Sequence, residues 1–249
     1  MIIEKIIKHI GKTILLPSTG TKVLRLSSSG KCTRELAYAY HGFPQSNPMQ
    51  AKTKFLLDDG DMHHADIRQR IHAAGIELTH EEFPVSLSIL PNLKIPGHID
   101  GLINPDSARP KLFEFKSSNH FAFQRFMKNG IAKSKEYLLQ INSYLAALHE
   151  SGFPEINEAI AVYKNKDTSE LAEDIVKFDP SVIEQVSAKF LNILGTTPDK
   201  LPNRDYGPDD NGLLAWQCSF CPHLTLCWGA TEPAVAGRRK GLKIFQKKT

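Results

Sequence analysis

The sequence is that of an ordinary globular protein of 249 residues, 41% of them hydrophobic and 23% charged. This composition excludes a disordered or collagen-like chain and provides enough apolar residues for one large core. No apolar run approaches the roughly 18 residues that a membrane span needs. Charged residues interrupt the N-terminal segment, where a signal peptide would be apolar. We therefore expect a soluble protein of the cytoplasm.

The net charge of +4 is unevenly distributed along the chain. Residues 1–40 hold seven Lys or Arg against two acids, and residues 216–249 hold six against one. Basic ends of this kind fit a polyanionic partner, although solvated basic segments are the commoner explanation. The charge alone leaves both interpretations open.

Hydrophobic periodicity predicts a mixed α/β fold in which short strands are flanked by helices. Helical spacing of apolar residues marks four segments: 2–15, 51–74, 121–150 and 180–194. A further helix carries Cys32 and reaches Tyr40, with Ser27–Ser29 as its expected N-cap. Short or alternating apolar runs bounded by turn residues predict strands at 83–90, 95–103, 111–117, 159–163 and 171–178.

The four cysteines have the spacing of a metal site. Cys218, Cys221 and Cys227 form a C-x2-C-x5-C segment, and Cys32 lies far upstream. Disulfides are not expected without an export signal, and a redox-active pair would need a thioredoxin-like context that the sequence lacks. Zinc and an iron–sulfur cluster both accept four thiolates, so the ligand count leaves both open. Either would bring the two basic ends of the chain together.

A pair of acids is expected to meet across a hairpin. Asn, Pro, Asp and Ser mark a turn between strands 95–103 and 111–117. If the hairpin is centred on Ser107, Asp100 and Glu114 stand opposite each other on one face, and Lys116 points to that face too. Asp106 is nearer to Glu114 in sequence but lies at the tip of the turn, so Asp100 is the expected partner.

Two carboxylates and a lysine on one face suit metal-assisted hydrolysis of a phosphodiester. The acids would hold Mg²⁺ or Mn²⁺, which polarises the phosphate and activates water, while the lysine stabilises the developing charge. The alternative is a solvated sheet face that carries a set of salt bridges, which is common among exposed charges.

Taken together, these segments resemble the PD-(D/E)XK nucleases, specifically the RecB-like iron–sulfur branch. That branch includes the CRISPR-associated RecB-like exonucleases, the AddB nuclease domain and their phage relatives. The resemblance runs from about Ser27 to Trp228. It rests on elements in the family's order: the first cysteine, Gly60–His64, Gly97–Asp100, Glu114–Lys116, Gln140–Tyr144 and the three clustered cysteines. Phe126–Gly130 and Tyr163–Asp167 are similar to phage-type members.

The resemblance implies a restriction-endonuclease-like core sheet flanked by helices, with the N- and C-terminal segments joined by a four-cysteine iron–sulfur cluster. It implies a single nuclease domain over residues 1–249. Within it we expect a helical part with the first cysteine at 27–80, the nuclease core at 81–195 and the closing cysteine segment at 205–230.

The resemblance also implies a role for each matched residue. His64, Asp100 and Glu114, with the carbonyl oxygen of Phe115, would coordinate the catalytic Mg²⁺ or Mn²⁺. Lys116 would be the catalytic lysine. Gln140 and Tyr144 would position the nucleic-acid backbone or the lysine. A structural [4Fe–4S] cluster would be held by Cys32, Cys218, Cys221 and Cys227.

Several positions keep alternatives. His63 competes with His64, but about 100° of helical rotation separates them, and the glycine spacing favours His64. His98 is left outside the metal set. Gln140 and Tyr144 also fit an ordinary amphipathic helix face.

Other residues fit nucleic-acid binding without being assigned to it. Tyr137, Phe121, Phe123 and Phe126 are of the type that stacks on bases, although core packing is their commoner role. Lys164 and Lys166 leave a strand near the expected cleft.

The function expected from the resemblance is a metal-dependent DNA nuclease, an exonuclease acting on single strands or DNA ends in recombination, repair or replication. A protein partner from one of those processes is expected too. An alternative of another class is a DNA-end-binding or assembly subunit with little activity of its own. A third is a four-cysteine zinc protein with an incidental acidic face.

Overall fold

The computed structural model describes residues 2–14, 24–47, 49–105, 109–236 and 239–245. The chain forms two compact units. The sheet unit comprises Leu24–Gly30 and Phe55–Leu191, and the cysteine unit comprises Met1–Val23, Lys31–Lys54 and Asn192–Thr249. The expectation of a single domain over the whole chain stays a prediction.

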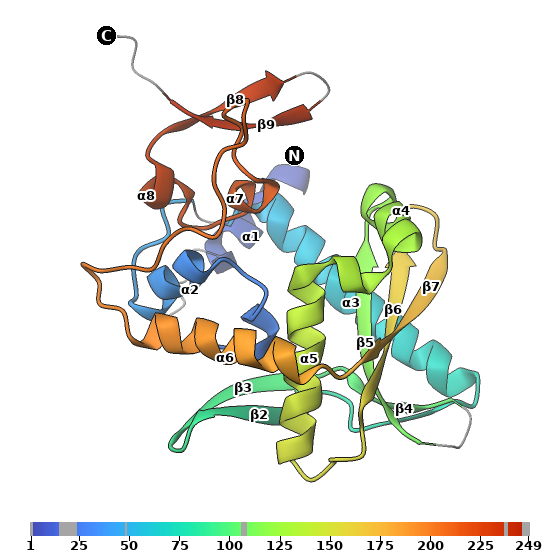
Figure 1. Cartoon of the computed structure of the whole chain (residues 1–249). Coiled ribbons are helices and arrows are strands. Elements are labelled where there is room, and N and C mark those ends of the chain that lie inside the picture. The colour runs from blue at the N-terminus through green and yellow to red at the C-terminus, as the bar shows by residue number, and fades with distance from the viewer. Residues whose placement is uncertain (1, 15–23, 48, 106–108, 237–238, 246–249) are drawn as a thin grey trace. The chain divides into compact units, whose positions relative to one another are not determined.

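The sheet unit is built on a five-stranded mixed sheet in the order β1–β4–β5–β6–β7 (Figure 1). The parallel pair is β5 with β6, and the other neighbouring pairs are antiparallel. A separate antiparallel ribbon is formed by β2 and β3. The strands are β1 (Glu77–Thr79), β2 (Phe83–Leu90), β3 (Leu93–Ile99), β4 (Gly101–Asn104), β5 (Lys111–Ser118), β6 (Glu158–Asn165) and β7 (Leu171–Lys177).

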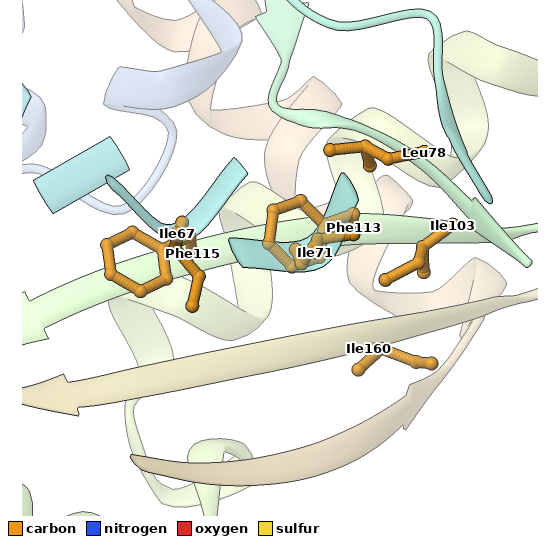
Figure 2. Close-up of a cluster of buried hydrophobic side chains, with 7 residues drawn as sticks. All are labelled: Ile67, Ile71, Leu78, Ile103, Phe113, Phe115 and Ile160. Atoms are coloured by element: carbon orange, nitrogen blue, oxygen red, sulfur yellow. The ribbon is translucent and has the colours of Figure 1, made fainter. Parts of the chain in front are cut away.

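One face of the sheet packs on the helix α3 (Ala51–Ala73). Ile67 and Ile71 of α3 pack against Phe113 and Phe115 of β5 (Figure 2). Successive strand residues point to opposite faces, so Glu114 and the residue two positions after it face away from α3. The apolar alternation therefore fixes the strand and presents its polar residues to the other side.

The other face of β5 is met by α5 (Lys135–Glu150), whose Gln140 side chain reaches Glu114. α6 (Pro180–Leu194) buries Val182, Val186 and Phe190 at spacings of four, as expected of a helix with one apolar face.

The expected helical region 121–150 is wrong as a continuous helix. It consists of α4 (His120–Asn129), the 3₁₀ turn η2 (Ile131–Lys133) and α5. Gly130 has a φ of 69°, a left-handed conformation that glycine adopts without steric cost and that commonly ends a helix.

Two further boundaries differ from the expectation. The predicted strand 95–103 divides at Asp100, because β3 pairs with β2 whereas β4 pairs with β1 and β5. Ser27–Ser29 do not cap the first cysteine helix, since residues Leu26–Ser28 form the 3₁₀ turn η1. The N-cap of α2 (Thr33–Tyr40) is Cys32 itself.

The cysteine unit joins α2 to the C-terminal segment through hydrogen bonds. Both the backbone N–H and the hydroxyl of Thr33 donate to Asp205 Oδ2 at 2.9 Å. Asn47 N–H donates to the carbonyl oxygen of Pro222 at 2.8 Å. The unit also contains α1 (Ile2–Ile14), α7 (Trp216–Ser219), α8 (Leu224–Trp228) and the antiparallel pair β8 (Thr231–Ala236) and β9 (Arg239–Ile244).

Among the residues that the structure describes, no helix is both long and apolar enough to cross a membrane.

The structure confirms the other predicted elements to within a few residues. These are the helices 2–15, 51–74 and 180–194 and the strands 83–90, 111–117, 159–163 and 171–178.

Candidate active site

Asp100 and Glu114 are brought together by the pairing of β4 with β5. The register aligns Gly101 with Phe113 and Ile103 with Lys111. Extending it by one residue places Asp100 opposite Glu114, as the hairpin centred on Ser107 predicts. Ser107 and Asp106, at the turn itself, lie outside the described residues.

Asp100 lies between the end of β3 and the start of β4, and hydrogen bonding fixes its carboxylate there. The backbone N–H of Phe115 donates to Asp100 Oδ2 at 2.8 Å. The other oxygen, Oδ1, lies 3.5 Å from His64 Nδ1. Asp100 is thus fixed by one contact from the sheet and faces an imidazole with its second oxygen.

Glu114 is the most deeply buried acid of this group, with 1% of the residue exposed. Its Oε1 accepts a hydrogen bond from Gln140 Nε2 at 2.9 Å and lies 2.5 Å from Lys116 Nζ. Its Oε2 is buried and has no hydrogen-bond partner among the described residues. Burial raises the pKa of the Glu114 carboxyl to about 7. A buried carboxylate oxygen without a partner is costly unless a cation fills the space beside it.

Lys116 lies between the acids and an aromatic ring. Its ammonium group is 5.6 Å from the centre of the Tyr137 ring. Burial lowers the pKa of Lys116, but the nearby carboxylates of Glu114 and Asp100 outweigh it and raise the pKa above its usual value. The side chain is therefore a fixed positive charge at the centre of the site.

His64, and not His63, faces the acids. The His64 ring packs edge-on against Phe115 with 4.9 Å between centroids. Burial lowers the pKa of His64, although the Asp100 charge opposes the change. A neutral imidazole is the form that binds metals. His98, which pairs with Pro84 in the β2–β3 ribbon, is exposed.

Gln140 and Tyr144 lie one turn apart on α5 and face the same group. Gln140 Nε2 is 3.4 Å from the Tyr144 hydroxyl. Tyr144 is 3% exposed, and burial raises its pKa. Its ring fits against Gly97, where a Cβ atom would come within 2.8 Å of Tyr144 Cε1. The missing side chain at Gly97 therefore makes room for the ring that sits beside Gln140.

The sequence interpretation left Tyr137 unassigned, although it contacts the lysine. Tyr137 meets the Tyr163 ring edge-on at 5.9 Å, and Tyr163 stacks on Phe126 at 3.8 Å. Residues 137, 140 and 144 are spaced i, i+3 and i+7 and so share one helix face. That spacing, counted from Gln140, is the signal that could have placed Tyr137 in the site.

In the cysteine unit, all four cysteines line one pocket. Arg204 Nε donates to Cys227 Sγ at 3.2 Å, and the Arg204 guanidinium lies over the Trp228 ring at 4.3 Å. Burial raises the pKa of Cys218, and it raises the pKa of Cys221 to about 12. The members of the pocket include Cys32, Cys218, Cys221, Cys227, Glu35, Tyr38 and Leu224.

Within the described ranges, no three His, Cys, Asp or Glu side chains are placed to hold a single metal ion. The site in the sheet unit offers two carboxylates and an imidazole, which are ligand types that divalent cations accept.

No protein-family model matches the chain, and no curated protein matches it. Among solved structures, SSO0001 is 16% identical, with a TM-score of 0.54 over 91% of this chain and 96% of that one. The alkaline exonuclease LHK-Exo from Laribacter hongkongensis is 15% identical, with a TM-score of 0.46 over 75% of this chain and 92% of that one. A phage-related exonuclease from Haemophilus somnus 129PT is 15% identical, with a TM-score of 0.43 over 67% and 89%.

The similarity to SSO0001 shows that the two chains share a fold. The mixed sheet flanked by helices is compatible with a nuclease core.

Proposed function

We propose that this protein is a divalent-metal-dependent deoxyribonuclease of the PD-(D/E)XK type, an exonuclease that acts on single-stranded DNA or DNA ends. The observation that carries the proposal is the pairing of Asp100 with Glu114 beside Lys116, with Glu114 Oε2 buried and lacking a hydrogen-bond partner among the described residues. A structural salt-bridge set would satisfy its buried oxygens internally. A pair of carboxylates that binds a cation instead leaves an oxygen free to coordinate it.

The donor set fits Mg²⁺ or Mn²⁺, which prefer oxygen ligands with an occasional imidazole. Asp100, Glu114 and His64 would hold the ion, together with the carbonyl oxygen of Phe115. When bound, the ion supplies Lewis-acid activation of the scissile phosphate and of the attacking water.

The chain's own residues supply positioning and charge. Lys116, held by Glu114 and the Tyr137 ring, would stabilise the charge that develops on the phosphate oxygens. Gln140 fixes the orientation of the Glu114 carboxylate. The Phe115 N–H fixes that of Asp100. These contacts fix the orientation of both carboxylates in the folded chain.

We further propose that the cysteine pocket holds a structural [4Fe–4S] cluster, with a four-thiolate zinc site as the second choice. Four thiols around one pocket, with an Arg204 N–H directed at one sulfur, match the donor set of either. On the same four cysteines we propose that the chain belongs to the RecB-like iron–sulfur branch of the superfamily. Such a nuclease would act in recombination, repair or replication, in the cytoplasm of a bacterial or phage-infected cell.

The test is digestion of end-labelled single- and double-stranded DNA with Mn²⁺, comparing the parent protein with Asp100→Ala. We expect the parent to shorten the labelled strand from its end and the variant to leave it intact, because one of two acids facing the cation is lost. If the parent binds DNA ends but does not cut them under any divalent cation, the end-binding subunit becomes the better account.

A further inference from the structure

The helix α4 presents an aromatic and cationic stripe to solvent. Phe121 is 81% exposed, and Arg125 and Lys128 are exposed as well. Their spacing of i, i+4 and i+7 places the three side chains within about 60° of one another around the helix. The sequence of α4, HFAFQRFMKN, contains no acid. In the part of the chain that the structure describes, neither Arg125 nor Lys128 forms an ion pair.

The start of α4 is fixed next to the end of β5, the strand that carries Lys116. Asn119 caps the helix by accepting a hydrogen bond from Ala122 N–H at 2.9 Å. The His120 N–H donates to Asp167 Oδ2 at 2.8 Å, which ties the helix to the turn after β6. The exposed stripe therefore begins five residues after Lys116, at a defined place.

The buried side of α4 connects to the site through stacked rings. Phe126 lies flat on Tyr163, with 11° between the ring planes. Tyr163 contacts Tyr137, and Tyr137 lies beside the Lys116 ammonium. These ring contacts fix the position of α4 relative to the strand that carries Lys116.

We propose that α4 guides a single strand of DNA into the site, with a base stacked on Phe121 and backbone phosphates on Arg125 and Lys128. This inference rests on the proposed function and specifies the form of its substrate. Single strands expose the faces of their bases, and an aromatic ring flanked by cations is the surface that binds them without sequence preference. A duplex hides those faces within its stack, so the exposed ring favours the single strand.

The experiment measures binding of a fluorescein-labelled oligo(dT) strand by fluorescence anisotropy, without added divalent cation so that no cleavage occurs. We expect Phe121→Ala to weaken binding about 10-fold or more, the loss that follows removal of one base–aromatic stack. The double change Arg125→Ala with Lys128→Ala should reduce the slope of log K against log salt by about 1.4, or roughly 0.7 for each phosphate contact.

Met127→Ala is the matched control. Met127 is 56% exposed on the same helix but lies on another side of it, about 120° away from Phe121. This variant should bind the strand like the parent. The small ester bis(p-nitrophenyl) phosphate has no base to stack on Phe121. Its hydrolysis with Mn²⁺ should therefore proceed at the same rate in the parent and in Phe121→Ala.

Two results would overturn the inference. One is a Phe121→Ala protein that binds oligo(dT) as tightly as the parent. The other is a parent that binds the matching duplex more tightly than the single strand through the same residues. Either can occur while the small phosphodiester is still cleaved, which would leave the proposed hydrolysis standing. A parent that cleaves neither DNA nor the small ester would contradict the proposed function itself.

Discussion

Replacing Lys116 with methionine is expected to lower the rate of DNA cleavage roughly 10²- to 10³-fold, the usual cost of removing one group that stabilises transition-state charge. Methionine keeps most of the length of the side chain but removes the ammonium that lies 2.5 Å from Glu114 Oε1. Single-turnover cleavage of an end-labelled strand with Mn²⁺ measures the rate. Strand binding measured without divalent cation should change little, because the α4 stripe is intact.

Lys111→Met is the matched control for this experiment. Lys111 lies on the same strand and pairs with Glu158 at the far end of β5. The same substitution there removes one positive charge from the same strand without touching the acids. The control should cleave DNA at the parent rate. A Lys116→Met protein that is folded and cleaves like the parent would exclude the lysine from the chemistry.

Replacing Cys218 with serine is expected to remove the proposed metal centre from the cysteine pocket and so to destabilise the cysteine unit. Cys218 is 9% exposed and lies in the pocket that all four cysteines line. Metal binding to a site that does not exist in the unfolded chain contributes directly to folding. A loss of about 4 kcal/mol, a size reached when a substitution removes a bound metal, would lower the melting temperature of a chain of this size by roughly 8–16 °C.

The measurements are anaerobic purification, metal analysis and thermal unfolding. An iron–sulfur parent would be brown and absorb near 400 nm (roughly, from sulfur-to-iron charge transfer), whereas a zinc parent would be colourless with bound zinc. Ser219→Ala, a change at the neighbouring residue, should keep both metal and stability. A parent that contains neither metal, together with a Cys218→Ser protein that melts at the same temperature, would rule out a metal centre in the pocket.

The pairing of the two acids could be predicted because it depends on local geometry. Once the centre of a hairpin is set, every opposed pair follows from counting, and the register of β4 with β5 agrees with a centre at Ser107. Helical rotation lets only one of His63 and His64 face the acids, and the spacing from Gly60 favoured His64. Hydrophobic periodicity also predicted α3 and β5. The apolar residues that repeat along each element are the ones that pack against one another in one buried cluster.

The sequence predictions differ from the structure where tertiary contacts determine the local conformation. Nothing local marks the division of the strand at Asp100, because it depends on β3 pairing with β2 and β4 pairing with its own neighbours. The interruption at Gly130 was visible in the sequence, but the apolar residues on either side maintain a helical pattern. Tyr137 was missed because a tyrosine on an apolar helix face is ordinarily part of the core, and its contact with Lys116 exists only in the folded sheet unit.

The most direct test of the central claim, that the opposed acids form a cation site, is Mn²⁺ binding followed by electron paramagnetic resonance in the parent and in Glu114→Gln. Glu158→Gln, on the neighbouring strand β6, is the matched control. The account predicts that Glu114→Gln weakens Mn²⁺ binding at least about 10- to 100-fold, the loss seen even for groups that only support a ligand, while the control binds like the parent. A folded Glu114→Gln protein that binds Mn²⁺ as tightly as the parent would contradict it.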